Sequence, residues 1–352
     1  MRPAQVGPSS STMVAAALLL LGCAAAAVVL VMGRRTGPAP APPLAQQAGP
    51  APQLAGTVPR PGEPVRPSPA VHAQPRGQPP PPVGSMGPER GAEVGRLLAS
   101  AEARLQAGDP GGSVADCNRA LELDPRHAPA WCQRGLSRQL QGDHTGARAD
   151  YDRTIELDPR HAPAWLHRGV LREARGDLSG ARADYDRAIE LDPRCATAYV
   201  NRGIVRAEQG DLDGARADFD GAIEVDPRCA AAWANRGRLR AEQGDLDGAR
   251  TDCDRAIELQ PRDPLSHTHR GVVRQRQGDL AGARADFDRA IELDPLLPQA
   301  YLNRGVVREK LGDLEGSIAD LERFLELDPA AELAPAARGK LAQVRARSAG
   351  KR

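Results

Sequence analysis

The sequence predicts an all-α protein whose main part is a solenoid of seven helix-turn-helix repeats, and three observations lead to this fold class. A Gly-Asp pair recurs every 34 residues, from Gly108 to Gly312. A proline near the end of each unit keeps the same step, from Pro125 to Pro329. No insertion interrupts the units, so each is expected to occupy an equivalent place in a stacked array.

Composition divides the chain into segments before any motif is considered. Residues 13–32 carry no charge over twenty positions, which predicts a single uncleaved transmembrane helix after a short tail of residues 1–12. Residues 33–90 are rich in proline and poor in aliphatic side chains, which predicts a disordered linker. Residues 330–352 predict a C-terminal cap helix with a basic tail. The repeats occupy residues 94–329 and are numbered 1 to 7 as 94–127, 128–161, 162–195, 196–229, 230–263, 264–297 and 298–331.

Within one unit the residue types predict two helices. The first covers positions 2 to 14 and often opens on a proline such as Pro129, where the missing N–H costs nothing. The glycine of the Gly-Asp pair can adopt the left-handed conformation that ends this helix. The aspartate, for example Asp211, can cap the second helix, which runs until an Asp-Pro pair stops it.

Nine of the ten aromatic residues stand at two positions of the unit. Glycine at position 8, such as Gly203, and alanine at position 20 let the helices approach closely. Large residues facing small ones at fixed offsets are typical of a packed helix hairpin. The aromatic residues are Trp131, Trp165, Tyr199, Trp233 and Tyr301 at position 4, and Tyr151, Tyr185, Phe219 and Phe287 at position 24.

This pattern resembles the tetratricopeptide repeat family, and the resemblance covers about two thirds of the chain. It implies a right-handed superhelix of antiparallel helix pairs with a concave groove lined mainly by the first helices. Repeat 1 departs from the pattern at Leu97, Ser100 and Ala101, as expected of a terminal unit. Residues 330–352 are similar to the helix that caps the last repeat in this family.

Arginine occupies positions 7 and 11 of repeats 2 to 7, and aspartate occupies position 23. Two rows of like charge on one helix would repel each other, so we expect the aspartates to pair with the position 7 arginines and to fix the register of the repeats. Arg202 and Asp218 represent this structural role, together with Trp131, Trp165, Gly203 and Trp233. The alternative is exposed charge that contributes about 0–1 kcal/mol per pair.

Position 6 of the first helices is the predicted peptide-binding row. It holds uncharged hydrogen-bonding side chains, and Asn201, Asn235 and Asn303 resemble the asparagine ladder in the tetratricopeptide groove of O-linked N-acetylglucosamine transferases. The alternative is that a polar residue simply suits a half-exposed groove. Position 9 adds mostly apolar side chains beside this row, and the rim of the groove is expected to be acidic through Glu173, Glu208, Glu242 and Glu309. The predicted groove residues are Gln133, His167, Asn201, Asn235, His269 and Asn303 at position 6, and Leu136, Val170, Ile204, Arg238, Val272 and Val306 at position 9.

We find no catalytic constellation, no metal-ligand spacing and no phosphate-binding loop, so no enzymatic activity, metal or cofactor is predicted. The net charge of +1, with acids and bases mixed in every repeat, argues against nucleic acid as a partner.

The predicted function is therefore a membrane-tethered scaffold that binds a protein or peptide segment in the groove. One alternative is a regulatory or substrate-recruiting subunit of an envelope enzyme complex. Another is a lipoprotein anchored through Cys23, because the residues before it resemble a bacterial lipoprotein cleavage box. We expect the repeats on the extracytoplasmic (periplasmic) side, with the cytoplasmic side left open.

Overall fold

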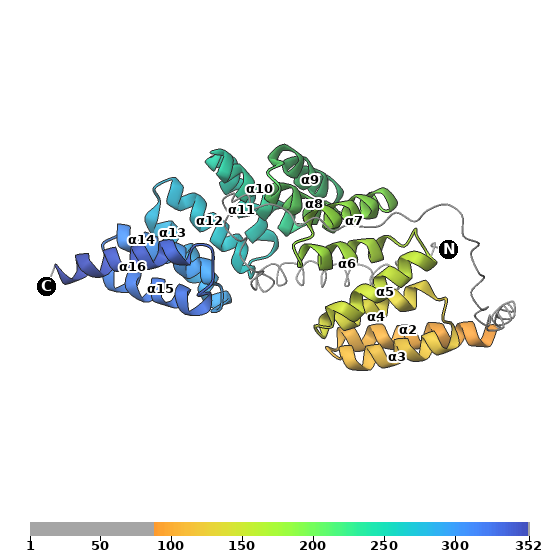
Figure 1. The fold of residues 1–352 in the computed structure, drawn as a ribbon. Coiled ribbons are helices and arrows are strands. Elements are labelled where there is room, and N and C mark those ends of the chain that lie inside the picture. Colours follow the sequence, from red (N-terminus) through yellow and green to blue (C-terminus); the bar gives the residue numbers. More distant parts are fainter. Residues whose placement is uncertain (1–87, 351–352) are drawn as a thin grey trace, which may run out of the picture.

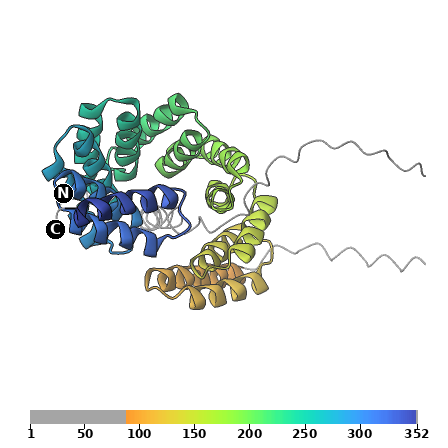
Figure 2. The same cartoon turned by 60° about the vertical axis from the view of Figure 1, so that its left-hand side comes forward.

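The computed structural model describes residues 88–350, which form fifteen α-helices and no β-strand. The helices pair side by side into a curved array, and Figure 2 shows that the array curls around an open centre. The first helices of the repeats are α2 (Pro88–Gln106), α4 (Ala128–Leu140), α6 (Ala162–Glu173), α8 (Ala196–Glu208), α10 (Ala230–Gln243), α12 (Pro264–Arg276) and α14 (Pro298–Lys310). The second helices are α3 (Pro110–Leu123), α5 (His144–Leu157), α7 (Leu178–Leu191), α9 (Leu212–Val225), α11 (Leu246–Leu259), α13 (Leu280–Leu293) and α15 (Leu314–Leu327), and α16 (Ala334–Ala349) packs on α15 (Figure 1).

The solenoid of helix pairs is confirmed for this part of the chain. No helix within residues 88–350 is both long and apolar enough to cross a membrane. The predicted tail, transmembrane segment 13–32 and most of the linker lie outside the described residues. The linker was expected to reach residue 90, but α2 already begins at Pro88, where a proline in the first turn and an acidic Glu89 both favour a helix start.

The Gly-Asp pairs end and begin helices as the sequence predicts. All seven glycines have positive φ angles, and Gly210 has φ of 84°. The following Asp211 accepts a hydrogen bond from the backbone N–H of Gly214 at 3.0 Å, which caps α9. Each unit therefore encodes its own turn.

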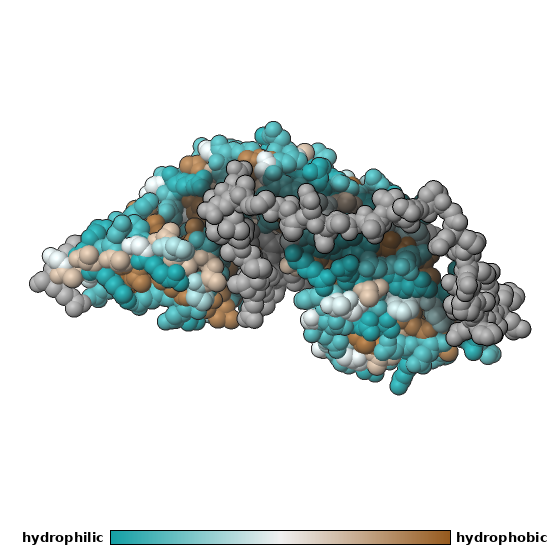
Figure 3. Space-filling model, viewed as in Figure 1, coloured by the Kyte–Doolittle hydropathy of each residue, from teal (hydrophilic) through white to brown (hydrophobic). Residues whose placement is uncertain are grey.

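The core lies between the helices of each pair. The aromatic side chains of position 24 are completely buried, as Phe219 and Phe287 illustrate. A Cβ atom added to Gly203 would lie 2.6 Å from the Phe219 ring, so only glycine allows this approach. Hydrophilic residues dominate the face of the molecule in Figure 3, and apolar residues are scattered over it.

The first helices line the inner side of the curve. Consecutive first helices such as α8 and α10 contact each other directly, whereas consecutive second helices make no comparable contacts. The elements on the inside of a curved array approach one another more closely than those on the outside. We use the term inner face for the side chains at positions 6, 9 and 12 of these first helices.

Candidate functional site

The arginines of position 7 join neighbouring repeats. Nη2 of Arg202 donates to Oδ1 of Asp218 at 2.5 Å, and Nε donates to Oδ2 at 3.0 Å. Nη1 donates to Oδ1 of Asp186, in the preceding repeat, at 2.7 Å. Burial alone would lower the pKa of Arg202, but the hydrogen bonds to both carboxylates hold it above its ordinary value. The same two-repeat link recurs at Arg134, where Asn118 replaces the second aspartate, and at Arg168, Arg236, Arg270 and Arg304.

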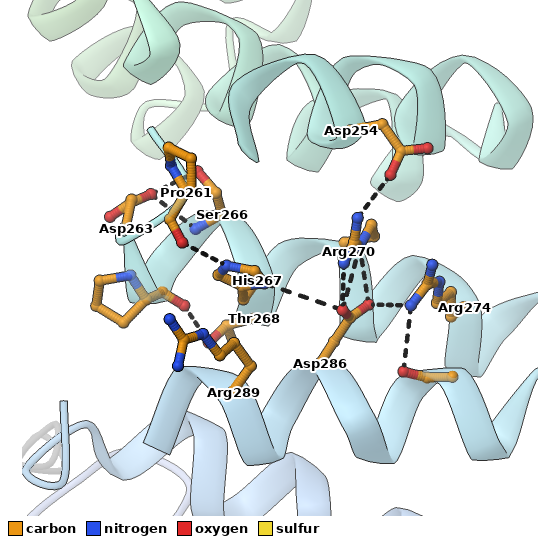
Figure 4. A network of polar contacts seen from close by, with 12 residues as sticks. Asp254, Pro261, Asp263, Ser266, His267, Thr268, Arg270, Arg274, Asp286 and Arg289 are labelled. Atoms are coloured by element: carbon orange, nitrogen blue, oxygen red, sulfur yellow. Dashed lines mark hydrogen bonds and ion pairs between the residues drawn. The ribbon is translucent and has the colours of Figure 1, made fainter. Parts of the chain in front are cut away.

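The arginines of position 11 complete the network. Figure 4 shows repeat 6, where Arg270 and Arg274 converge on the buried carboxylate of Asp286 and Arg270 also reaches Asp254. Nη1 of Arg274 donates to Oδ2 of Asp286 at 2.9 Å. Each position 23 carboxylate therefore faces two guanidinium groups. We call positions 4, 7, 11, 23 and 25 together the inter-repeat network.

The aromatic residues of position 4 cover the arginines. The guanidinium carbon of Arg134 lies 4.4 Å from the ring centroid of Trp131, within cation–π range. Nε1 of Trp131 donates to the carbonyl of Pro125, in the preceding repeat, at 3.0 Å. Trp165 and Trp233 make the same two contacts. The two arginine rows are thus engaged inside the array and do not form a free basic surface.

The position 6 side chains of repeats 2, 3 and 5 make contacts within the chain. Nε2 of Gln133 donates to the carbonyl of Leu98 at 3.1 Å, which links α4 to α2. The His167 ring stacks on Tyr151 with centroids 5.6 Å apart. Nδ2 of Asn235 donates to a carbonyl of its own helix at 2.9 Å. These contacts within the chain engage side chains that the sequence predicted to bind a ligand.

Two of the other position 6 residues keep unused polar atoms. Asn201 is 5% exposed, and its Nδ2 has no hydrogen-bond partner in residues 88–350. Nδ1 of His269 is also buried without a partner. Burial lowers the pKa of His269 to about 4, so this ring is neutral at physiological pH. Asn303 is half-buried on α14. The six residues therefore share one row without forming a continuous line of free amides.

The position 9 side chains lie beside this row. All six of them, Leu136, Val170, Ile204, Arg238, Val272 and Val306, are half-buried. Nη1 of Arg238 donates to Oε1 of Glu242, one turn later, at 2.6 Å. The inner face consequently offers aliphatic side chains that alternate with polar ones.

Position 12 holds polar groups whose contacts the sequence did not predict, since it placed Glu173 and Glu309 only as acid at the rim of the groove. The hydroxyl of Tyr185 donates to Oε2 of Glu173 at 2.6 Å, and the hydroxyl of Tyr151 donates to Oε1 of Gln139 at 2.8 Å. Burial raises the pKa of Glu173 to about 7, and the charge of Glu208 adds to the rise against the Tyr185 hydrogen bond. The available signal was that each tyrosine at position 24 accompanies a hydrogen-bonding residue at position 12.

The described residues include no preformed metal site. No group of three or more His, Cys, Asp or Glu side chains within residues 88–350 is placed to hold a metal ion. Burial raises the pKa of Cys117, Cys132 and Cys253 to about 12, so these thiols stay protonated and are poor nucleophiles.

Comparisons with known proteins agree with this architecture. The family model described as tetratricopeptide repeat matches five stretches, of which the first four overlap: 98–160, 132–194, 168–224, 200–264 and 270–332. A tetratricopeptide repeat protein from Parabacteroides merdae is 18% identical with a TM-score of 0.56, over 72% of this chain and 99% of its own. The Cut9–Hcn1 hetero-tetramer of the APC/C contains a chain that is 20% identical with a TM-score of 0.59, over 74% of this chain and 51% of its own. PilF of Pseudomonas aeruginosa is 17% identical with a TM-score of 0.52, over 60% of this chain and 97% of its own. No curated protein sequence matches the chain.

Proposed function

Because the chain belongs to the tetratricopeptide repeat family, we propose that it is an interaction scaffold whose inner face binds a segment of another polypeptide. The observation that carries this proposal is a set of shielded polar atoms without partners on that face. They are Nδ2 of Asn201, Nδ1 of His269, Oε1 of Glu173 and Oε1 of Glu102, which stands at position 9 of repeat 1. A buried polar group without a hydrogen bond costs about 1–3 kcal/mol, and a bound polypeptide would remove part of that cost.

The variation between repeats points to the same face. Positions 7, 11 and 23 hold the same residue in each of repeats 2 to 7, and their side chains are engaged with one another. Positions 6, 9 and 12 differ from repeat to repeat. A surface that reads one partner along its length needs such differences, whereas a packing contact between identical units does not.

We also propose that the protein is not an enzyme. Reactive groups in the repeats recur at equivalent positions, so no single location collects a nucleophile, a base and an orienting group. The half-buried aliphatic side chains of position 9 suit contact with a polypeptide instead.

A photo-crosslinking pair tests the scaffold proposal. A benzophenone amino acid at Ile204 would lie on the inner face of repeat 4, and the same amino acid at Ala217 would lie exposed on its second helix. We expect irradiation of living source cells to attach a polypeptide through position 204 and to attach much less through position 217. Attachment through position 217 alone would place binding on the outer face and contradict the proposal.

The finer part of the proposal is that residues 13–32 tether the scaffold to a membrane, with the repeats on the extracytoplasmic side. Twenty uncharged residues match the thickness of a bilayer core, which takes about 20 residues of helix. A proline-rich spacer of residues 33–87 would then carry the repeats away from the membrane surface.

Membrane fractionation with two variants tests the tether. The wild-type chain should pellet with membranes after a carbonate wash, and Leu19→Arg combined with Val28→Arg should release it. Cys23→Ser should leave the chain in the pellet, because the proposed anchor is the helix and not a lipid. Release by Cys23→Ser would support lipidation, and degradation of the repeats by protease added to intact cells would support the extracytoplasmic side.

A further inference from the structure

Glu173 is a carboxylate on the inner face that lacks a positive partner. Its Oε2 accepts from the hydroxyl of Tyr185 at 2.6 Å, but its Oε1 is shielded from solvent and accepts no hydrogen bond in residues 88–350. The nearest acidic neighbour, Glu208 on α8, has the same sign of charge. The position therefore has capacity for a donor that the chain does not supply.

Asn201 adds a second unused group beside it. This residue is 5% exposed, and its side-chain amide faces the same Tyr185 hydroxyl. Because an amide carries two N–H groups, its buried Nδ2 keeps donor capacity for a ligand. Glu173 comes from α6, Tyr185 from α7 and Asn201 from α8. We call these three residues the acidic cluster; it combines one free acceptor with one free donor.

The chain shows what the same position binds when cations are provided. Glu309 stands in repeat 7 where Glu173 stands in repeat 3. Its Oε1 lies 2.5 Å from Nη1 of Arg347 and its Oε2 lies 2.9 Å from Nζ of Lys340, both on α16. Its side chain is only 10% exposed. A position 12 carboxylate can thus be buried when two basic side chains pair with it.

Repeat 4 replaces both of these cations. In the 34-residue register Lys340 corresponds to Ile204, and Arg347 corresponds to Asp211. In that register α8 presents the aliphatic Ile204 where α16 presents lysine, and Asp211, which caps α9, lies beyond the end of α8. Among the other position 12 residues, Gln139 is neutral and bonded to Tyr151, and Ala207 and Ala241 carry no polar group. Of the two position 12 carboxylates, Glu173 is the one left without a cation in residues 88–350.

We propose that the acidic cluster receives one lysine or arginine side chain of the bound polypeptide. The cation donates to Glu173 Oε1, and a carbonyl of the same polypeptide accepts from Asn201 Nδ2. This inference rests on the proposed scaffold function and specifies its partner: a segment with a basic residue that anchors on repeats 3 and 4. The exposed Glu208 at the rim attracts the same charge.

The test uses the full-length chain and two synthetic peptides. The basic peptide has the sequence of residues 334–349, APAARGKLAQVRARSA, and the neutral peptide has glutamine in place of its arginines and lysine. Binding is measured by fluorescence anisotropy for the wild type, Glu173→Gln and Ile204→Lys. Glutamine keeps an acceptor for the Tyr185 hydroxyl, and the lysine at 204 supplies the cation from within, as Lys340 does for Glu309. Circular dichroism checks that both variants are folded.

We expect the basic peptide to bind the wild type at least about tenfold more tightly than either variant, since a hydrogen bond to a charged group is lost. The neutral peptide should bind all three proteins equally. The preference for the basic peptide should increase from pH 6 to pH 8 as Glu173, flanked by Tyr185 and Glu208, ionises, and Glu173→Gln should remove this increase. Equal binding of the basic peptide to wild type and Glu173→Gln, or no binding to wild type, overturns the inference. The crosslinking pair at 204 and 217 judges the scaffold proposal separately.

Discussion

The inter-repeat network and the inner face follow opposite rules within the same helices. In the network, Arg202 and its equivalents make the same contacts in repeats 2 to 7. On the inner face, the equivalent side chains stack on a ring, bond to their own helix or remain without a partner. Residues that recur in every repeat thus form equivalent contacts, and residues that vary form different contacts or none. The difference teaches that the recurring contacts join the repeats in the same way along the array, whereas the inner face is free to vary from repeat to repeat.

Removing a network carboxylate should have the largest effect. Asp218, whose side chain is 3% exposed, faces both Arg202 and Arg206. Asp218→Leu leaves two guanidinium groups without their carboxylate, and we expect the free energy of unfolding to fall by about 3–5 kcal/mol. Urea unfolding of the full-length chain followed by circular dichroism measures it.

Two further variants sharpen this prediction. Arg202→Met combined with Asp218→Leu should cost clearly less than the sum of the single losses, because the double variant leaves fewer unpaired charges. Additive losses would contradict the pairing. Asp213→Asn is the matched control on α9, since Asp213 is 90% exposed and its loss should change stability by less than about 0.5 kcal/mol.

The buried histidine of repeat 3 should make stability depend on pH. Burial, with a smaller contribution from His161, lowers the pKa of His167 to about 4, below the ordinary value of about 6.5 for an unfolded chain. The unfolded state therefore takes up a proton first, and stability falls as the pH drops from about 6.5 toward 4. The loss is about 3 kcal/mol by pH 4.

Glu173 acts in the opposite direction over nearly the same range. Its pKa of about 7 in the folded chain lies above the ordinary value, so its stabilising effect is present at low pH and is lost as the pH rises through 7. The effect of His167 is therefore isolated by comparing wild type with His167→Asn, which introduces the residue found at position 6 of repeats 4, 5 and 7. The free energy of unfolding of both proteins is measured at pH 7 and at pH 4. If the free energy of unfolding of the wild type, relative to that of His167→Asn, is no lower at pH 4 than at pH 7, then His167 is not buried in its neutral form.

Adding a methyl group between the two helices of a pair should have an intermediate effect on stability. Gly203→Ala places a Cβ atom 2.6 Å from the Phe219 ring, which cannot bend away. We expect a loss of about 1–3 kcal/mol from this overpacking. Gly305→Ala is the matched control at the same position of repeat 7, where the nearest side-chain atoms, of Asp320 and Leu321, lie at 3.3 Å. Equal losses in thermal unfolding would mean that the aromatic ring does not set the requirement for glycine.

The sequence predicted the network well because its geometry depends on spacing alone. Sixteen residues separate Arg202 from Asp218, and a hairpin with a fixed turn brings that spacing together in every repeat. The second link from Arg202 to Asp186 joins two repeats, so it became visible only once their packing was known. The sequence placed Glu173 only as acid at the rim of the groove, and its contacts were missed for a related reason: its environment is set by Tyr185 and by α8 of the next repeat. The inner face depends on contacts between units that are not identical, and those do not follow from the repeat pattern.

The smallest predicted effect comes from a substitution that gives repeat 6 the position 4 aromatic residue of its neighbours. His267 takes the place of the position 4 aromatic. Its Nε2 lies 3.0 Å from the carbonyl of Pro261, and its buried Nδ1 lies 4.0 Å from Oδ1 of Asp286, too far for a hydrogen bond. Tryptophan at this position in repeats 2, 3 and 5 makes the carbonyl contact and also covers the arginine three residues later.

His267→Trp should therefore stabilise the chain by about 0.5–1 kcal/mol, through a cation–π contact with Arg270 and the loss of an unsatisfied nitrogen. Tyr301→Trp in repeat 7 is the control, because Tyr301 already makes both contacts and its replacement should be close to neutral in the same urea titration. A loss of stability in His267→Trp with a neutral Tyr301→Trp would mean that repeat 6 has packed around its histidine. The network would then be less uniform than its sequence pattern suggests. Repeat 6, like the inner face, would have contacts that differ from those of the equivalent residues in other repeats.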